Sequence, residues 1–242
     1  MKRQLFLLLI VLWGCQNPVQ KQSDTITVSI LPQKYLVEQL AGNILKVNVL
    51  VPPGSSPHNY EILPSQMKEM ARSKAWIQIG LLTFEDAWKE KLGEINKNLL
   101  IANSSERIPL LAGSDHDHEA EGHHHAETFD PHVWLSPAEM KVLGQNTLNA
   151  LTKCFPDHQC EFEENYASFV RKVDSLSVQI DQKLSPLKNR NILIFHPALA
   201  YFARQFHLQQ TPLELDGKEP SSKHMKEVVD LAHQQNIRVI FI

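Results

Sequence analysis

Short strand-like segments alternate with amphipathic helical segments along most of the chain. The first part of this pattern predicts strands at 25–30, 45–51, 75–79 and 99–103, and helices at 32–41, 65–72 and 84–96, the last with Thr83 as its N-cap. The pattern returns near the C-terminus, with strands at 191–195, near 209–213 and at 238–242. One helix is expected to end near 206, and another is expected at 222–235. Such alternation is typical of parallel sheets covered by helices on both faces. We therefore expect an α/β fold with two (β/α) lobes.

One long helix is expected to join the two lobes. Apolar residues recur at steps of three and four from Phe162 to Leu184, a stripe of about six helical turns. A helix of this length exceeds a crossover inside a small sheet, so we interpret it as a rigid link; one helix of a bundle is the alternative. Ser136, Pro137 and Glu139 predict a capping box at the start of the linking region. The expected organisation is an N-terminal lobe at 25–135, linking helices at 136–188 and a C-terminal lobe at 189–242.

The N-terminus predicts export and a lipid anchor. Met1 to Cys15 combines two cationic residues with an apolar run and ends in Leu-Trp-Gly-Cys. The run is far shorter than the ~20 apolar residues of a spanning helix, which indicates a secretory signal. Its end resembles a bacterial lipobox, so we expect a signal peptide at 1–14, a lipid on Cys15, a tether at 15–24, and a location in the periplasm or on the cell surface. An apolar N-terminal helix with a chance Gly-Cys is the alternative.

The net charge bears on the classes of partner that the protein can bind, and the cysteines bear on whether a disulfide can form. The 242 residues carry a formal net charge of −3 and the sequence pI is about 6.5, which argues against nucleic acid as a partner. We also expect a monomer. Cys154 and Cys160 flank a segment that contains a proline. In an oxidising compartment they can close a small disulfide loop, or they can remain two reduced thiols, and the sequence leaves both open.

A segment rich in histidine and carboxylates interrupts the alternation. Residues 115–127 contain no apolar side chain larger than alanine, so we expect a mobile loop at 113–127 that cannot offset its own ordering entropy by packing. Its composition is that of an auxiliary metal collector, and a solvated acidic linker is the alternative. The candidate loop ligands are His116, His118, His123, His124 and His125.

Three other histidines share one position in the expected fold. His58 follows the second strand, His132 comes after the fourth strand by way of the loop, and His196 follows the first strand of the C-terminal lobe. Open α/β sheets bind ligands at the carboxyl ends of their strands, so the three side chains can meet across a cleft between the lobes. Three neutral imidazoles suit Zn²⁺ better than Mn²⁺, and Asp130 is placed to orient His132. Each histidine alone could equally be an ordinary surface residue, because no short motif fixes their spacing.

Motifs along the whole expected mature chain resemble one protein family. They are P-P-G-S-S-P-H-N-Y-E at 52–61, E-D-A-W at 85–88, F-D-P-H-V-W-L-S-P at 129–137, F-H-P-A-L-A-Y-F-A at 195–203 and G-K-E-P-S-S-K-H at 217–224. The chain resembles the cluster A-I solute-binding proteins of bacterial ABC transporters for zinc and manganese, and most of all their ZnuA-like branch. The resemblance implies two lobes joined by one rigid helix, metal in the cleft, and a permease with its ATPase as partner. It also implies that His58, His132 and His196 are the ligands, and the third histidine favours zinc.

The resemblance further implies a β-α segment after 238–242, whose loop often supplies an acidic fourth ligand. This segment is absent from the sequence, so we expect either a truncated C-terminal lobe or water as the fourth ligand. Two other functions fit a three-histidine site: a secreted metallohydrolase and a surface adhesin of the same family. A hydrolase needs a carboxylate base, and no motif supplies one, so we expect a binding protein and not an enzyme.

Overall fold

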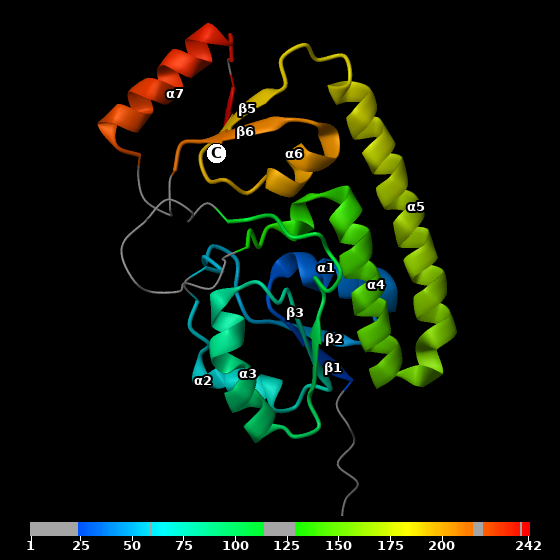
Figure 1. Cartoon of the computed structure of the whole chain (residues 1–242). Helices are drawn as coiled ribbons and strands as arrows, with labels where there is room; N and C mark the ends of the chain where they lie inside the picture. Colours follow the sequence, from blue (N-terminus) through cyan, green and yellow to red (C-terminus); the bar gives the residue numbers. More distant parts are fainter. Residues whose placement is uncertain (1–23, 59, 114–128, 215–219, 238) are drawn as a thin grey trace, which may run out of the picture.

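The computed structural model describes residues 24–58, 60–113, 129–214, 220–237 and 239–242, and it contains two parallel sheets (Figure 1). The strands are β1 (Thr25–Val28), β2 (Lys46–Val49), β3 (Ala75–Gln78), β4 (Leu100–Asn103), β5 (Asn191–Ile194), β6 (Gln209–Pro212) and β7 (Ile240–Phe241). The helices are α1 (Leu31–Ala41), α2 (Pro64–Met70), α3 (Thr83–Ile95), α4 (Pro137–Cys154), α5 (Gln159–Leu184), α6 (Ala200–Phe206) and α7 (Ser222–Gln234), with 3-10 turns η1 (Val133–Leu135) and η2 (Pro156–His158).

The two sheets define two lobes, as the alternation predicted. The first has the order β2-β1-β3-β4 and forms the N-terminal lobe; the second has the order β6-β5-β7 and forms the C-terminal lobe. All strand pairs are parallel. The expected strands and helices are present, and their ends differ from the expected ones by a residue or two, as helix and strand ends commonly do.

Both faces of the N-terminal sheet are buried. Ile26 and Ile77 belong to a cluster with residues of α1 and α4, whereas Trp76 belongs to a cluster with residues of α2 and α3. Successive side chains of a strand point to opposite faces, so neighbouring residues of β3 enter different clusters. Figure 1 shows α2 and α3 on one side of this sheet and α1 and α4 on the other.

Helix α5 runs along the outside of α1 and α4 and leads from the N-terminal lobe to the C-terminal lobe (Figure 1). Its N-terminal part buries Phe162, Phe169 and Val173 against the N-terminal lobe. Further along the stripe, Leu176 is 50% exposed, because the helix there passes beyond the lobe that covers it. The expected link between two lobes is confirmed.

Two expected helix caps are wrong in detail. Helix α3 begins at Thr83 itself, and Leu82 is its N-cap. Ser136 is the N-cap of α4 and Pro137 its first residue, as predicted, but the Ser136 hydroxyl bonds to the Glu139 carboxylate and to no backbone N–H of the helix. The other oxygen of the Glu139 carboxylate accepts from Arg204 of α6, and the Ser136 backbone N–H donates to the Val133 carbonyl, so the capping box does not form.

The C-terminal lobe has a small core of its own and one helix that packs against the other lobe. Leu193, Leu213 and Val228 form the small core between the sheet and α7. Helix α6, in contrast, packs against α4 and η1, and Tyr201 on it is fully buried in the core of the N-terminal lobe. None of the helices in the described ranges combines the length and apolar character needed to cross a membrane.

Candidate metal centre

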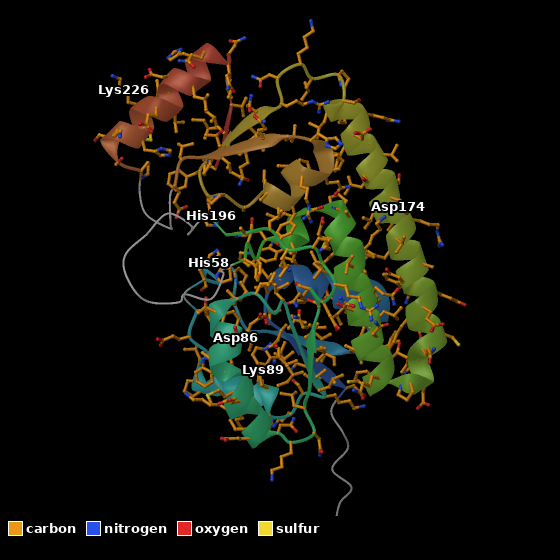
Figure 2. The ribbon with its side chains drawn as sticks, viewed as in Figure 1. His58, Asp86, Lys89, Asp174, His196 and Lys226 are labelled. Atoms are coloured by element: carbon orange, nitrogen blue, oxygen red, sulfur yellow. The ribbon has the colours of Figure 1, made fainter. Side chains whose placement is uncertain are left out.

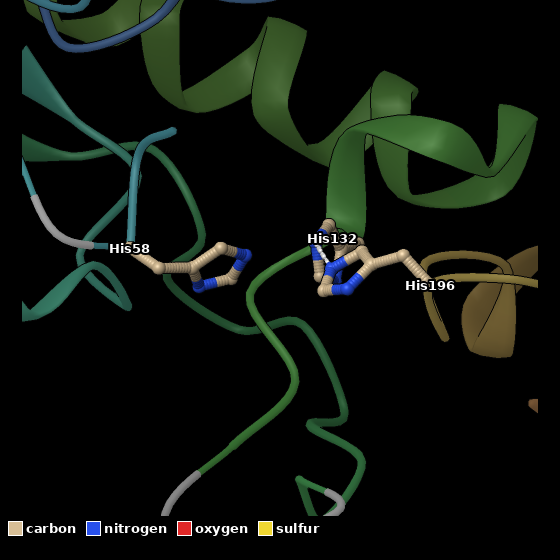
Figure 3. Close-up of side chains that lie close together, drawn as sticks. All are labelled: His58, His132 and His196. Carbon is tan, nitrogen blue, oxygen red and sulfur yellow. Dashed lines mark hydrogen bonds between the residues drawn. The ribbon is translucent and has the colours of Figure 1, made fainter. Parts of the chain in front are cut away.

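Three histidines from distant parts of the chain meet between the lobes. Each of His58, His132 and His196 offers a ring nitrogen, and these three atoms lie within 4.8 Å of one another. The ring centroids are 5.0–5.4 Å apart. Figure 2 shows His58 and His196 facing each other from the two lobes, and Figure 3 shows the His58 ring opposite the His132 and His196 pair. Within the described ranges, this is the group of side chains found able to hold a metal ion.

His58 lies on a turn-rich loop after β2. Gly54 in this loop has a φ of 82°, a conformation that glycine adopts readily, and the Ser55 N–H donates to the Pro52 carbonyl at 3.2 Å. The His58 N–H donates to the Ser56 hydroxyl at 3.3 Å. The loop therefore turns back over the carboxyl edge of the sheet and brings the His58 ring to the cleft.

His132 is the most buried member of the site and is held by Asp130. Asp130 Oδ1 accepts the His132 backbone N–H at 2.8 Å and lies 2.7 Å from His132 Nδ1. Both side chains are almost completely buried, and the Trp134 ring lies 5.2 Å from the His132 ring. The predicted orienting role of Asp130 therefore has a geometric basis.

His196 follows β5 and has a carboxylate partner that the sequence interpretation missed. Its Nδ1 lies 2.9 Å from Glu214 Oε2. Glu214 lies two residues beyond the end of β6, and β6 pairs in parallel with β5, so both side chains are at the same edge of the sheet. The only signal for Glu214 in the sequence is that shared strand-end position, which does not by itself separate an acid that holds a ligand from a solvated one.

The two hydrogen-bonded histidines point their free nitrogens at each other. A neutral imidazole has one N–H, and in the tautomer that places it at Nδ1, facing the carboxylate of Asp130 or Glu214, the Nε2 carries a lone pair. The Nε2 atoms of His132 and His196 are 3.2 Å apart, and two lone pairs at that distance repel unless a cation lies between them. Tetrahedral zinc with Zn–N bonds of ~2.0–2.1 Å holds its nitrogens roughly 3.3 Å apart. The observed separation therefore fits two ligands of one zinc ion.

The environment of His58 favours the neutral ring that metal binding requires. Burial lowers the pKa of His58, and the neighbouring imidazoles of His132 and His196 lower it further. Asp130 and Glu214 oppose these effects with smaller contributions to the pKa. The lone pair of His58 is thus available at lower pH than that of an unperturbed histidine.

The remaining predicted site residues divide into two groups. Cys154 and Cys160 are free thiols, so the disulfide alternative is wrong in the structure: Cys154 ends α4 with its thiol toward the Lys74 carbonyl, whereas Cys160 is exposed in the first turn of α5. The other predicted residues lie outside the described ranges; they are Cys15, His116, His118, His123, His124 and His125.

Comparison with known proteins gives one consistent result. A family model described as ZnuA, zinc-uptake complex component A, periplasmic, matches residues 26–242. The zinc-binding lipoprotein AdcA of Streptococcus pneumoniae is 31% identical over an alignment of 249 residues, gaps included, and the match covers 96% of this chain and 48% of AdcA. A putative metal-binding protein of Chlamydia trachomatis is 29% identical over an alignment of 246 residues, gaps included, and the match covers 99% of this chain and 84% of that protein. The chain thus spans about half the length of AdcA and most of the chlamydial protein.

Solved structures agree with the sequence relatives. A crystal structure of ZnuA superposes with a TM-score of 0.79 and 36% identity, covering 88% of this chain and 79% of that one. The Zn(II)-bound ZnuA-like domain of Streptococcus pneumoniae AdcA gives a TM-score of 0.73 and 25% identity, covering 89% of this chain and 77% of that one.

Proposed function

Because the chain belongs to the family of zinc-uptake complex component A, periplasmic, we propose that it binds Zn²⁺ outside the cytoplasm and delivers it to an ABC transporter for import. The observation that carries this proposal is the meeting of His58, His132 and His196 between the lobes, with two Nε2 atoms 3.2 Å apart. A site between two lobes can be reached from solvent and can release its ion intact to a permease. The permease and its ATPase are the partners of this function.

The chemistry of the site supports zinc over manganese. All three candidate ligand atoms are imidazole nitrogens, which zinc binds readily, whereas manganese sites recruit carboxylate oxygen. The carboxylates of Asp130 and Glu214 each face the Nδ1 of a histidine, which is the arrangement expected of groups that orient metal ligands. This arrangement supports a binding protein rather than a metallohydrolase.

The same proposal covers the parts of the chain that lie outside the described ranges. We assign a lipid anchor to Cys15 and weak auxiliary zinc binding to the His-rich segment at 113–127. A monomer held at the membrane by its lipid, with one tight site and several weak ones, is the form of the protein that this proposal implies.

Zinc titration of histidine variants tests the proposal. His58→Ala, His132→Ala and His196→Ala should each abolish or strongly weaken the tightest zinc site, measured by competition with a chelator. His233→Ala is the matched control, because His233 is an exposed histidine in the last turn of α7. Wild-type affinity in any one of the three variants removes that residue from the ligand set, and a wild-type protein without a tight zinc site refutes the function.

A further inference from the structure

Tyr201 belongs to the C-terminal lobe but is buried in the N-terminal lobe. It lies in the first turn of α6, its side chain has no exposed area, and it shares a core cluster with Val133 and Leu143. Burial raises the pKa of the Tyr201 phenol, so the hydroxyl stays protonated and can donate a hydrogen bond. A buried hydroxyl normally has a specific partner, and this one has two.

Both partners of the hydroxyl are backbone groups beside the metal centre. The Tyr201 hydroxyl donates to the Asp130 carbonyl at 2.8 Å and accepts the Leu111 N–H at 3.2 Å. Leu111 and Asp130 are themselves joined, because the Asp130 N–H donates to the Leu111 carbonyl at 2.9 Å, and Ala112 and Phe129 form an antiparallel bridge. We call residues 111–112 and 129–130 the stem. The Tyr201 hydroxyl thus bonds to both strands of the stem.

The stem leads directly to a candidate ligand. The side chain of Asp130 holds His132 at two points, its backbone N–H and its Nδ1. A displacement of the Asp130 backbone would therefore move the His132 ring. Arg204, one turn further along α6, donates to the Pro109 carbonyl at 2.7 Å, so the same helix also holds the chain just before the stem.

Tyr201 is also close in sequence to the ligand candidate of the other lobe. His196 lies five residues before it, and the loop between them ends where α6 begins. Helix α6 is therefore joined to His196 by a short loop and to the Asp130 backbone by a hydrogen bond. These two connections lead to the two rings whose Nε2 atoms are 3.2 Å apart.

We propose that Tyr201 is a positioning residue of the metal centre, which acts through the Asp130 backbone to hold His132 at the ligand distance from His196. This inference rests on the proposed zinc function and adds a residue that does not touch the metal. Because its hydroxyl bonds to the stem, the relative position of His132 and His196, which come from different lobes, depends on these two hydrogen bonds. Removing the hydroxyl should loosen His132 while leaving all three imidazoles present.

The test compares two tyrosines whose hydroxyls both bond to backbone carbonyls. Tyr201→Phe removes the bond to the stem, and Tyr166→Phe removes a bond of 3.0 Å to the Lys141 carbonyl, between α5 and α4. We expect Tyr201→Phe to weaken tight zinc binding about 3- to 10-fold, below the ~10–100-fold typical for a residue bonded directly to a ligand. Tyr166→Phe should leave zinc affinity unchanged, although both variants should lower the melting temperature of the zinc-free protein.

Two further measurements separate positioning from general destabilisation. In an Asp130→Ala background, Tyr201→Phe should cause no additional loss of zinc affinity, because the connection to the His132 ring is already cut. In zinc-free protein at one fixed pH, ¹⁵N NMR should show His132 changing from one tautomer to a mixture in Tyr201→Phe and remaining in one tautomer in Tyr166→Phe.

The outcomes distinguish this inference from the proposed function. If the wild type binds zinc tightly and Tyr201→Phe has the same zinc affinity and the same His132 spectrum, the positioning role is wrong and the proposed function stands. Equal affinity losses in Tyr201→Phe and Tyr166→Phe also overturn it, because the effect is then one of stability alone. Absence of tight zinc binding in the wild type defeats the function, whereas the zinc-free spectra still test the connection between Tyr201 and His132.

Discussion

Removal of the two carboxylates that hold the candidate ligands should weaken zinc binding unequally. Asp130 makes two bonds to His132, at 2.7 and 2.8 Å, and its side chain is 8% exposed. Glu214 makes one bond to His196, at 2.9 Å, and its side chain is 16% exposed. The His196 side chain is 40% exposed, whereas that of His132 is 9% exposed. Water can replace a lost partner at His196 more easily than at His132. We therefore expect Asp130→Ala to be the more damaging change.

The magnitudes follow from the number and burial of these bonds. Loss of a partner that orients a metal ligand typically weakens binding ~10–100-fold. The buried, doubly bonded Asp130 belongs near the upper end, and Glu214 near the lower end. These limits correspond to about 2.8 and 1.4 kcal/mol, since a tenfold change in affinity is about 1.4 kcal/mol. Asp130→Asn keeps an acceptor for the His132 backbone N–H but loses the charge, so its effect should lie between wild type and Asp130→Ala.

Competition between the protein and a fluorescent zinc chelator measures these differences. Asp174→Ala is a suitable control, because it removes an exposed carboxylate of α5 that pairs with Lys141 of α4, and Asp174 lies away from His58 and His196 (Figure 2). The control should bind zinc like the wild type. If Glu214→Ala weakens binding more than Asp130→Ala, or if Asp130→Ala has no effect, burial and bond number do not determine how strongly each carboxylate supports zinc binding.

Three other predictions concern the pH response, the backbone and the thiols. The zinc-free His58 imidazole should titrate by NMR below the ~6.5 of free histidine, because burial lowers its pKa. Its neutral ring therefore contributes fully to the free energy of unfolding above pH ~6.5, and this contribution is lost as the pH falls from ~6.5 through the lowered pKa of the folded protein. Gly54→Ala should lower the free energy of unfolding in urea by about 1–2 kcal/mol, because the φ of Gly54 is positive. Gly80→Ala should lower it more, because the φ of Gly80 is also positive and an added Cβ would lie 2.3 Å from a side chain of β4. Alkylation without reductant should modify both Cys154 and Cys160, with Cys154 slower because burial raises its pKa; a cross-linked peptide would contradict the free thiols.

The architecture was predictable because it depends on periodic signals. Strands of four residues with both faces buried and helices with an apolar stripe leave a pattern in the sequence that turns and caps interrupt at regular intervals. The position of His58, His132 and His196 was predictable for a related reason: parallel strands end at one edge, so residues that follow strands come together there. These inferences need only the order of elements along the chain.

Glu214 and Tyr201 were not predictable in the same way. A single acid after a strand carries no pattern that separates it from a solvated one. The Tyr201 hydroxyl bonds to backbone atoms, one of them 71 residues away, and a backbone acceptor leaves no mark in the sequence. The N-cap expected at Thr83 was wrong because the helix begins at Thr83 itself, with Leu82 as its N-cap, and the capping box expected at Ser136 was wrong because the Ser136 hydroxyl bonds to the Glu139 carboxylate and not to the helix backbone.

The centre is assembled from two halves that each form within one lobe. Asp130 and His132 are two residues apart, so their pairing is local, and His196 and Glu214 follow the paired strands β5 and β6, so their pairing is set by one sheet. The distance between the two halves is set by neither. The positioning role proposed for Tyr201 assigns it to α6, whose Tyr201 is buried against the N-terminal lobe and whose Arg204 bonds to Glu139 at 2.6 Å. A change in this interface should therefore alter zinc affinity even when every ligand and every orienting carboxylate is intact.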